Sequence, residues 1–388
     1  MAYKKFTADN IFTGYEMLSG DSVLITDEKG TVLDIANRKD AGGDIQELNG
    51  ILTPGFVNCH CHLELSHLKG LVPKGTGMVQ FLLTVMGNRD HPSAEMLGAI
   101  AAAEESMVHS GIVAAGDICN TDNTVLQKQQ RSIHYHNFIE AAGFSEDIAG
   151  LRFGLALELY EKFGADASIA PHAPYSVSGN LFDLINKHEP GSLLTIHNQE
   201  SHAENELFQR GTGDFLKLYS KAGIDISDFK ITGKTSIQSY LNKITRDHSL
   251  LLVHNTVTDQ ADLDWVFYNK TFLPELFWCI CPNANLYINN RIADISLLVR
   301  AGCKMVVGTD SLASNDQLNM LEELKTLLER FSFLTLTELL KWATVNGARA
   351  LRIADRYGSF ERGKKPGLVL VENVSDGSLT GASSRKIL

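Results

Sequence analysis

His60 and His62 are two histidines separated by one residue at the end of an apolar run of strand length. Alternate residues of a strand point to the same face, so both imidazoles can bind one metal ion. His197 and Asp310 end two later runs of the same kind. Three imidazoles and one carboxylate form a mixed nitrogen and oxygen set that suits Zn or Fe(II) and leaves a position open for water. The pattern therefore predicts a catalytic metal site rather than a structural one.

The elements that must position these residues are eight apolar runs of strand length, separated by longer stretches with helical spacing. This alternation is typical of parallel βα units. Two of the intervening segments, residues 92–111 and 315–331, are predicted helices, and we expect the second to open with an Asn or Asp cap. The eight runs cover residues 51–62, 111–118, 132–141, 168–177, 193–201, 251–256, 277–285 and 304–314.

Nearly every run ends in polar or ionisable side chains. In a (β/α)8 barrel the carboxyl ends of the strands line one mouth, where the active sites of this fold lie. A doubly wound open sheet is the alternative, but it would not bring its first and last strands together. Joint use of the first and last runs therefore favours a closed TIM-type barrel over residues 51–355. The polar residues at the run ends are His60, His62, Asp117, Glu140, His172, His197, Glu200, His254, Asn283, Asn285 and Asp310.

The two ends of the chain have a different pattern. Residues 1–50 contain short strand-like pieces with a turn signal between two alternating runs, and residues 356–388 look similar. We expect these segments to pair into a small β-sandwich module beside the barrel.

Composition limits the classes of partner. The chain has 388 residues, 44% hydrophobic and 21% charged, which is typical of a globular protein. Its net charge of -11 repels phosphate backbones and anionic lipids, so nucleic acid and membranes are excluded as expected partners. With neither a signal-peptide pattern nor an apolar stretch of about 18 residues, a cytoplasmic location is expected. The six cysteines lack zinc-ribbon spacing, and we interpret them as packing residues.

Five sequence pieces carry a family resemblance. They are, in order, PGFVNCHCH, APHAPYSVS, HNQE, VHN and GTDSLASN. A single H-x-H is a weak signal, but this ordered set resembles the amidohydrolase superfamily over almost the whole chain. Within it, the chain is similar to the deaminase branch that includes adenosylhomocysteine, guanine and cytosine deaminases.

The resemblance implies roles for the residues at the run ends. It makes His60, His62, His197 and Asp310 the metal ligands and Glu200 the residue that moves protons. It also makes His254 the group that polarises the attacking water or the tetrahedral centre. Asp310 would also accept a proton from that water. Hydrolytic deamination needs a proton on the ring nitrogen and another on the departing ammonia, and one carboxyl group that alternates between acid and base can serve both transfers.

Several other residues have expected roles outside the metal site and the proton transfers. Members with two metals carry a carboxylated lysine at the end of the fourth strand, where this chain has His172. The resemblance therefore implies one metal ion and gives His172 a contact with the substrate sugar. Glu64 could bind a purine edge or face solvent. Ser311, Ser314 and Asn315 could cap the following helix or touch the leaving group, and the cap is favoured. Packing roles are expected for His67, His134, His136 and His202.

The implied substrate is an aminopurine or a 6-aminopurine nucleoside derivative, such as aminodeoxyfutalosine, methylthioadenosine or adenosylhomocysteine. The expected cofactor is one divalent ion per chain, zinc first and iron as the alternative. Two other functions stay open: hydrolysis of a ring amide or chloro-substituent, and a non-catalytic scaffold paralogue, which retention of all the ligands disfavours. The expected partner is a small molecule, and homodimerisation is left open.

Overall fold

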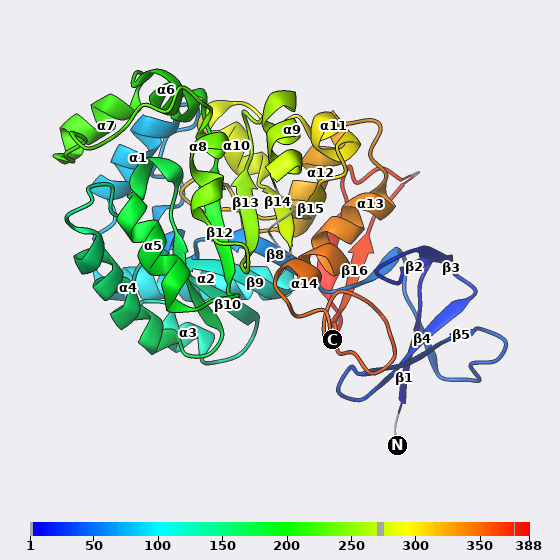
Figure 1. Cartoon of the computed structure of the whole chain (residues 1–388). Helices are drawn as coiled ribbons and strands as arrows, with labels where there is room; N and C mark the ends of the chain where they lie inside the picture. Colours follow the sequence, from blue (N-terminus) through cyan, green and yellow to red (C-terminus); the bar gives the residue numbers. More distant parts are fainter. Residues whose placement is uncertain (1–2, 270–274, 376) are drawn as a thin grey trace.

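The computed structural model describes residues 3–269, 275–375 and 377–388 (Figure 1). Eight parallel strands form two four-stranded sheets, with the orders β11-β10-β9-β8 and β12-β13-β14-β15. The predicted parallel βα alternation is confirmed. The strands are β8 (Phe56–Cys61), β9 (Ile112–Cys119), β10 (His134–Ala141), β11 (Ala167–Pro171), β12 (Leu193–Asn198), β13 (Ser249–His254), β14 (Leu276–Ile280) and β15 (Lys304–Val307).

The two sheets touch at both of their outer edges. Where β8 meets the segment after β15, Cys61 and Asp310 form a parallel bridge, and the backbone N–H of Asp310 donates to the carbonyl of His60 at 3.1 Å. Where the segment after β11 meets β12, the N–H of His197 donates to the carbonyl of His172 at 2.9 Å. The strand ends that carry the predicted site residues are therefore linked across both edges.

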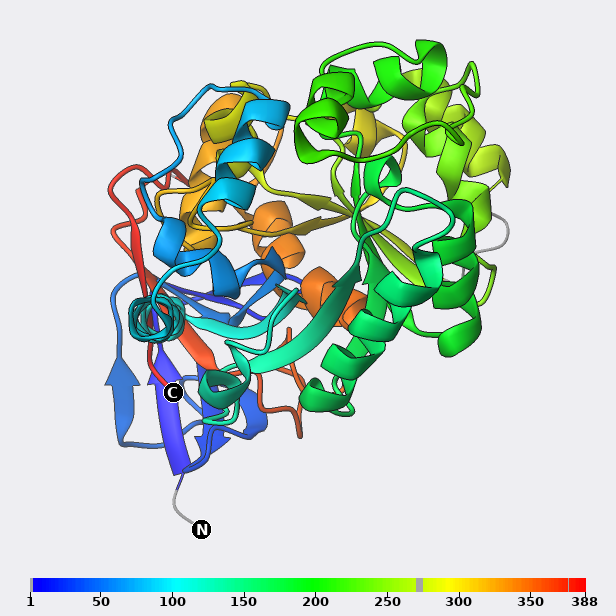
Figure 2. The same cartoon turned by 90° about the vertical axis from the view of Figure 1, so that its left-hand side faces the viewer.

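Helices lie on the outer side of these strands (Figures 1 and 2). Side chains on both faces of the strands are buried. On β13, Leu250 and Leu252 belong to one hydrophobic cluster, while Leu251 and Val253 belong to another. Burial on both faces explains why the strands appear in the sequence as unbroken apolar runs.

Both predicted helices are present, but the second begins later in the chain than expected. The predicted helix at 92–111 is α2 (Ser93–His109), but the one predicted from 315 begins only at Met320, where the side chain of Asn319 accepts the N–H of Leu321. Among the described residues, no helix is long and apolar enough to cross a bilayer. The remaining helices are α1 (Met78–Gly87), α3 (Val125–Lys128), α4 (Ala149–Phe163), α5 (Gly179–His188), α6 (His202–Arg210), α7 (Phe215–Ala222), α8 (Ser236–Tyr240), α9 (Gln260–Asn269), α10 (Pro282–Asn289), α11 (Ile295–Arg300), α12 (Met320–Arg330), α13 (Leu336–Lys341) and α14 (Gly347–Ala350).

The two termini share a sheet at one end of the molecule, where the red C-terminal strand lies beside the blue N-terminal strands (Figure 1). That sheet has the order β17-β16-β7-β2-β3, and an N-terminal sheet has the order β5-β4-β1-β6. Apolar residues from both sheets, such as Leu24 and Leu368, are buried in one cluster. These strands are β1 (Tyr3–Thr7), β2 (Asn10–Phe12), β3 (Met17–Ser19), β4 (Ser22–Asp27), β5 (Val32–Asn37), β6 (Ile45–Glu47), β7 (Ile51–Pro54), β16 (Leu368–Glu372) and β17 (Ser383–Lys386).

The first predicted run, residues 51–62, is two strands rather than one. Its start, β7, pairs with β16 and β2 in the terminal sheet, and only β8 joins the parallel sheet. The terminal module therefore extends beyond the boundary expected at residue 50.

Candidate active site

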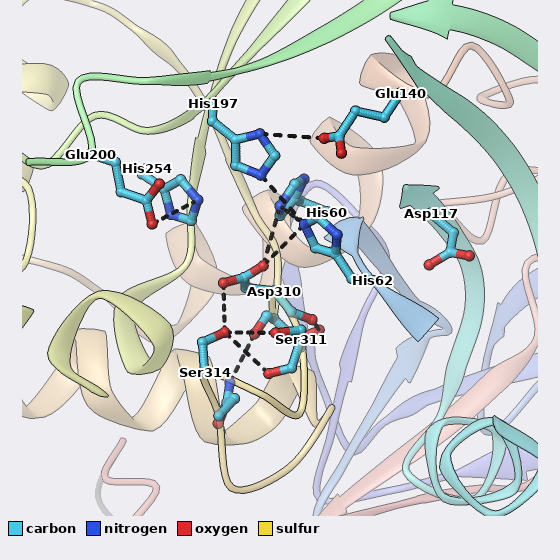
Figure 3. Close-up of polar contacts among 12 residues, drawn as sticks. His60, His62, Asp117, Glu140, His197, Glu200, His254, Asp310, Ser311 and Ser314 are labelled. Atoms are coloured by element: carbon cyan, nitrogen blue, oxygen red, sulfur yellow. Dashed lines mark hydrogen bonds and ion pairs between the residues drawn. The ribbon is translucent and has the colours of Figure 1, made fainter. Parts of the chain in front are cut away.

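The four predicted ligand side chains converge on one point (Figure 3). Nε2 of His62 lies 3.2 Å from Nε2 of His60 and 3.4 Å from Nε2 of His197. Oδ1 of Asp310 lies 3.4 Å from Nε2 of His60 and 3.3 Å from Nε2 of His62. All four residues are buried. A tetrahedron of ligands about 2.0–2.1 Å from a zinc ion has edges of about 3.3–3.4 Å, so these four separations match those expected around a zinc ion.

The protonation of these groups also suits a cation. Nδ1 of His197 lies 2.8 Å from the carbonyl oxygen of His172. Because a carbonyl oxygen can only accept, Nδ1 of neutral His197 carries the proton. The lone pair is therefore on Nε2, which faces the cluster. Burial and the neighbouring histidines lower the pKa of His197 well below its usual value. Burial alone would raise the pKa of Asp310, but its bond to His60 and the charge of His62 hold that pKa well below the usual value.

The backbone around the site adopts conformations that are uncommon for residues other than glycine. His254 has φ 76° and Asp310 has φ 58°, both in the left-handed region. Gly308 lies against His60, and a Cβ atom at Gly308 would be 2.8 Å from the Cβ of His60. The segment around Asp310 therefore fits only with a glycine at this close approach.

Ser314 and Asn315 support the Asp310 segment and do not cap a helix. Oγ of Ser314 donates to Oδ2 of Asp310 at 2.6 Å, which leaves Oδ1 directed at the imidazoles. Nδ2 of Asn315 donates to the carbonyl of Thr309 at 2.9 Å. The predicted cap role is wrong, because Asn319 caps α12. Ser311 lines the cavity beside Asp310.

Glu200 and His254 form a buried pair next to the ligand cluster, with 3.4 Å between Oε1 of Glu200 and Nε2 of His254 (Figure 3). Burial and the charges of Asp310 and Glu204 raise the pKa of Glu200 well above its usual value. Burial lowers the pKa of His254 to about 3. Nδ2 of Asn285 donates to Nδ1 of His254 at 3.0 Å, so neutral His254 carries its proton on Nε2. The pair thus combines a carboxyl group that favours its protonated form with a neutral imidazole.

Glu204 is a supporting residue that the sequence reasoning missed. Its carboxylate accepts the backbone N–H of Gln199 at 3.0 Å and that of Glu200 at 3.2 Å, and it also bonds to the hydroxyl of Ser236. Burial raises the pKa of Glu204 to about 7. Glu204 lies four residues after Glu200, a spacing that could have drawn attention to it.

Among the described residues, His60, His62 and Asp310 offer ligand atoms within 4.8 Å of one another, and two other groups do the same. One consists of His60, His197 and His254, and another of Glu140, His172 and His197. In the second, Oε1 of Glu140 lies 3.8 Å from Nδ1 of His197 and 4.0 Å from Nε2 of His172. The residues Glu140 and His172 therefore lie close to the predicted ligands. The histidines for which packing was expected, His67, His134, His136 and His202, are in none of these described groups.

Asp117 fixes the backbone that follows the two histidines of β8. Its Oδ1 accepts the N–H of Leu63 at 2.8 Å, and its Oδ2 accepts from Nζ of Lys128 at 2.5 Å. The Asp117 side chain is fully buried and that of Lys128 is 7% exposed. Asp117 was expected at the mouth of the barrel, with no assigned role. In the structure, it holds the backbone of the segment that contains His62.

We expect Lys128→Met to lower the free energy of unfolding by about 3–5 kcal/mol, because it leaves the Asp117 carboxylate buried without its counterion. Urea unfolding of the metal-free protein measures the change. Lys162→Met is the matched control, because the Lys162 pair with Asp122 has about the same length, 2.7 Å, but is half exposed. That control should change stability by no more than about 1 kcal/mol. Equal effects of the two substitutions would show that the buried pair has no special role.

Glu64 differs from both of its expected placements. It is buried, so it does not face solvent. Its Oε2 accepts the backbone N–H groups of Asn120 at 3.0 Å and Thr121 at 2.9 Å, and its Oε1 accepts from Nη2 of Arg89 at 2.7 Å. Both oxygens are thus engaged by the protein, and the expectation that Glu64 binds a purine edge is corrected.

One cavity of about 550 Å³ contains the site. His172 and Glu140 line it near the ligand cluster, and the apolar side chains of α1 and α4 form much of its wall. The cavity brings together most of the predicted residues but not Glu64. Predicted residues on its lining are His62, His172, His197, Glu200, His254 and Asp310.

Comparisons with known proteins find the amidohydrolase family and several deaminases. The Amidohydrolase family model matches residues 51–384. An adenosine deaminase of Helicobacter pylori is 29% identical over 330 residues, which cover 82% of this chain and 78% of that protein. The crystal structure of Helicobacter pylori aminofutalosine deaminase in complex with methylthio-coformycin superposes with a TM-score of 0.80 at 25% identity, covering 96% and 93% of the two chains. An adenosine deaminase from Xanthomonas campestris with bound zinc shares the fold, with a TM-score of 0.71 at 21% identity and coverages of 95% and 84%.

Proposed function

Because the chain belongs to the amidohydrolase family, we propose that it is a metal-dependent hydrolase that releases ammonia from a 6-aminopurine nucleoside derivative. The observation that carries the proposal is the position of the buried Glu200–His254 pair on the same cavity as the four converging ligand atoms. The similar deaminases support the substrate class.

The proposal includes a closed (β/α)8 barrel and a β-sandwich made by the terminal segments. The bonds of His60 with Asp310 and of His172 with His197 support closure at the two edges where the sheets meet. The shared apolar cluster of the two terminal sheets supports the sandwich.

His60, His62, His197 and Asp310 are the proposed ligands of one divalent ion, zinc first and iron as the alternative. Their separations of 3.2–3.4 Å and their donor types support this assignment. A divalent metal at such a site supplies Lewis acidity, which can lower the pKa of a water molecule from 15.7 to about 7.

The remaining residues account for the proton transfers. The raised pKa of Glu200 favours the protonated form, which can give its proton to the ring nitrogen beside the carbon under attack. As a carboxylate, Glu200 can then take up and pass on the proton that the departing amine needs. The low pKa of Asp310 keeps it ionised and able to accept a proton from water. The Nε2–H of His254 can stabilise negative charge on the oxygen that attacks.

The test is ammonia release from a panel of substrates by protein of known metal content. The panel contains adenosine, methylthioadenosine, adenosylhomocysteine and aminodeoxyfutalosine, with a 6-chloropurine nucleoside and a cyclic amide for the alternative reactions. Ammonia from one of the aminopurine nucleosides, with the corresponding hypoxanthine nucleoside in equal amount, is expected. Turnover of the chloride or the amide alone would replace deamination by the other hydrolytic function.

A further inference from the structure

Glu323 of α12 is a fully buried carboxyl group that the proposed proton transfers do not use. Burial raises its pKa to about 8, although the hydrogen bonds that it accepts oppose this shift. A carboxyl group whose pKa rises on folding lowers the free energy of unfolding as the pH increases above its usual pKa, 4.5. Ionisation of Glu323 therefore costs stability near neutral pH. The reason for its burial must lie in the hydrogen bonds of its two oxygens.

The first oxygen of Glu323 fixes the side chain of Asn315. Oε1 of Glu323 accepts from Nδ2 of Asn315 at 2.8 Å, and the same Nδ2 donates to the carbonyl of Thr309 at 2.9 Å. The NH2 group of an asparagine has two donors, so both of them are in use here. Glu323 thus determines which end of the Asn315 amide faces Thr309.

The carbonyl of Thr309 belongs to the peptide group that precedes Asp310. At the other end of this peptide group, the N–H of Asp310 donates to the carbonyl of His60 at 3.1 Å. Asp310 has φ 58°, and a residue other than glycine keeps such a conformation only where its surroundings hold it. The bonds from Asn315 and to His60 hold the two ends of the peptide group. The direction of the Asp310 carboxylate therefore depends on Glu323, through Asn315.

The second oxygen of Glu323 holds the first turn of α10. Oε2 accepts the backbone N–H of Asn283 at 3.0 Å. The first N–H groups of a helix have no partner within the helix, and the N-cap residue of α10, Cys281, makes no side-chain bond to them. The carboxylate of Glu323 supplies the missing acceptor from a different helix, and the hydroxyl of Thr326 on α12 adds a bond to Oδ1 of Asn283 at 2.6 Å. The start of α10 is therefore fixed to α12.

The same turn of α10 carries Asn285, which holds His254. Nδ2 of Asn285 donates to Nδ1 of His254 at 3.0 Å, and both side chains are buried. This bond decides which ring nitrogen of neutral His254 carries the proton. If the N–H of Asn283 lost its acceptor, the first turn of α10 could shift, and Asn285 would move with it. The orientation of His254 therefore also depends on Glu323.

We infer that Glu323 is a positioning residue that fixes the Asp310 segment and the first turn of α10 relative to each other. Asp310 and His254 line the same cavity, and each would lose its direction if Glu323 released its segment. The inference rests on the roles proposed for Asp310 and His254, and it adds the residue that joins them. Glu323 itself touches neither the ligand atoms nor the substrate in this account.

Glu323→Met removes both acceptor oxygens and keeps the length of the side chain. We expect its zinc affinity, measured by competition with a chelator, to fall by about 10-fold, the lower end of the range for residues that orient ligands. At saturating zinc, kcat should also fall by about 10-fold with a much smaller change in KM, because Asp310 and His254 act on the attacking water. Glu323→Gln keeps one acceptor oxygen and should recover part of both losses.

Glu322→Gln is the matched control at the neighbouring position. Glu322 is partly exposed and pairs with Lys325 at 2.7 Å on the surface of the same helix. Its zinc affinity and kcat should equal those of wild type. Unchanged zinc affinity and kcat in Glu323→Met protein would overturn the inference, and so would equal losses in the Glu322→Gln control.

Double-mutant cycles distinguish positioning from a general loss of structure. Residues that act through one another have effects that do not add, whereas independent effects do add. In an Asn315→Ala background, Glu323→Met should therefore weaken zinc binding by less than about 2-fold. In an Asn285→Ala background, it should lower kcat by clearly less than in wild type. Full additivity in both cycles would contradict the proposed connections.

Zinc affinity separates the inference from the proposed function, because it is measured without turnover. If wild-type protein binds zinc but releases no ammonia, a lower zinc affinity in Glu323→Met that is absent in the Asn315→Ala background still supports the inference. If wild-type protein releases ammonia but Glu323→Met binds zinc and turns over as wild type does, the deaminase function stands and the inference fails.

Discussion

Glu200→Gln protein will keep its metal and lose turnover by about 10²–10⁴-fold, the usual effect of removing a general acid–base. The amide matches the carboxyl group in shape but cannot pass a proton to the ring nitrogen or to departing ammonia. The buried pair with His254 at 3.4 Å should remain in place, so the KM should change much less than kcat. Steady-state ammonia release and metal analysis of the same sample measure both effects.

Glu206→Gln is the matched control, because Glu206 is exposed on the same helix as Glu204 and has no part in the site. It should retain full turnover. Full activity in Glu200→Gln protein would contradict the assigned proton transfers.

The same substitution also has an expected effect on stability. Burial raises the pKa of Glu200 above 4.5, so above pH 4.5 the unfolded chain releases this proton more readily than the folded protein does. This group therefore lowers the free energy of unfolding as the pH rises from 4.5 towards its folded-state pKa. Metal-free Glu200→Gln protein should consequently be more stable than metal-free wild type at pH 7, and by less at pH 4. Thermal unfolding at the two pH values tests the sign.

His197→Ala will lose metal and activity together. Removing a partner that only orients a ligand usually costs 10–100-fold in metal affinity, so removal of a ligand itself should cost more than about 100-fold. Its Nε2 lies 3.4 Å from that of His62, and its Nδ1–H is already held by the carbonyl of His172, so the ring is positioned for this single task. Competition with a chelator of known affinity measures the loss.

His202→Ala is a suitable control, because His202 is exposed and contacts Arg291 outside the ligand clusters of the described residues. Metal content should be unchanged in this variant. If His197→Ala protein bound zinc as tightly as wild type, the proposed ligand set would have to be revised.

The parallel strands and the convergence of their polar ends could be predicted because both depend on local pattern. Apolar runs of strand length identify the strands, and parallel strands place their carboxyl ends at one edge. His60, His197 and Asp310 therefore could be expected to meet although they are far apart in the sequence. The structure brings their ligand atoms together as that reasoning requires.

The division of residues 51–62 was missed because both strands are buried and apolar. Pro54 and Gly55 were the available signal, since this pair of residues often ends an element. Gly55 has a structural reason as well: a Cβ there would lie 2.3 Å from a methyl group of Val113. The chain turns from the terminal sheet into β8 at a place where only glycine fits.

The residues that support the site could not be predicted from spacing. Glu64 binds Asn120, 56 positions away, and Asp117 binds the backbone of Leu63, 54 positions away. Such contacts between side chains and the backbone depend on how loops pack, for which one sequence has no periodic signal.

We propose that this chain uses a metal held by His60, His62, His197 and Asp310 to remove the amino group of a purine nucleoside. The most direct measurement follows ammonia release from the best substrate of the panel before metal removal, after removal with a chelator, and after return of one zinc per chain. We expect activity to fall to background and then to recover, with half of the activity at half an equivalent of zinc. Undiminished ammonia release from metal-free protein would contradict the claim, and so would a metal-loaded, folded protein that releases none from any nucleoside tested.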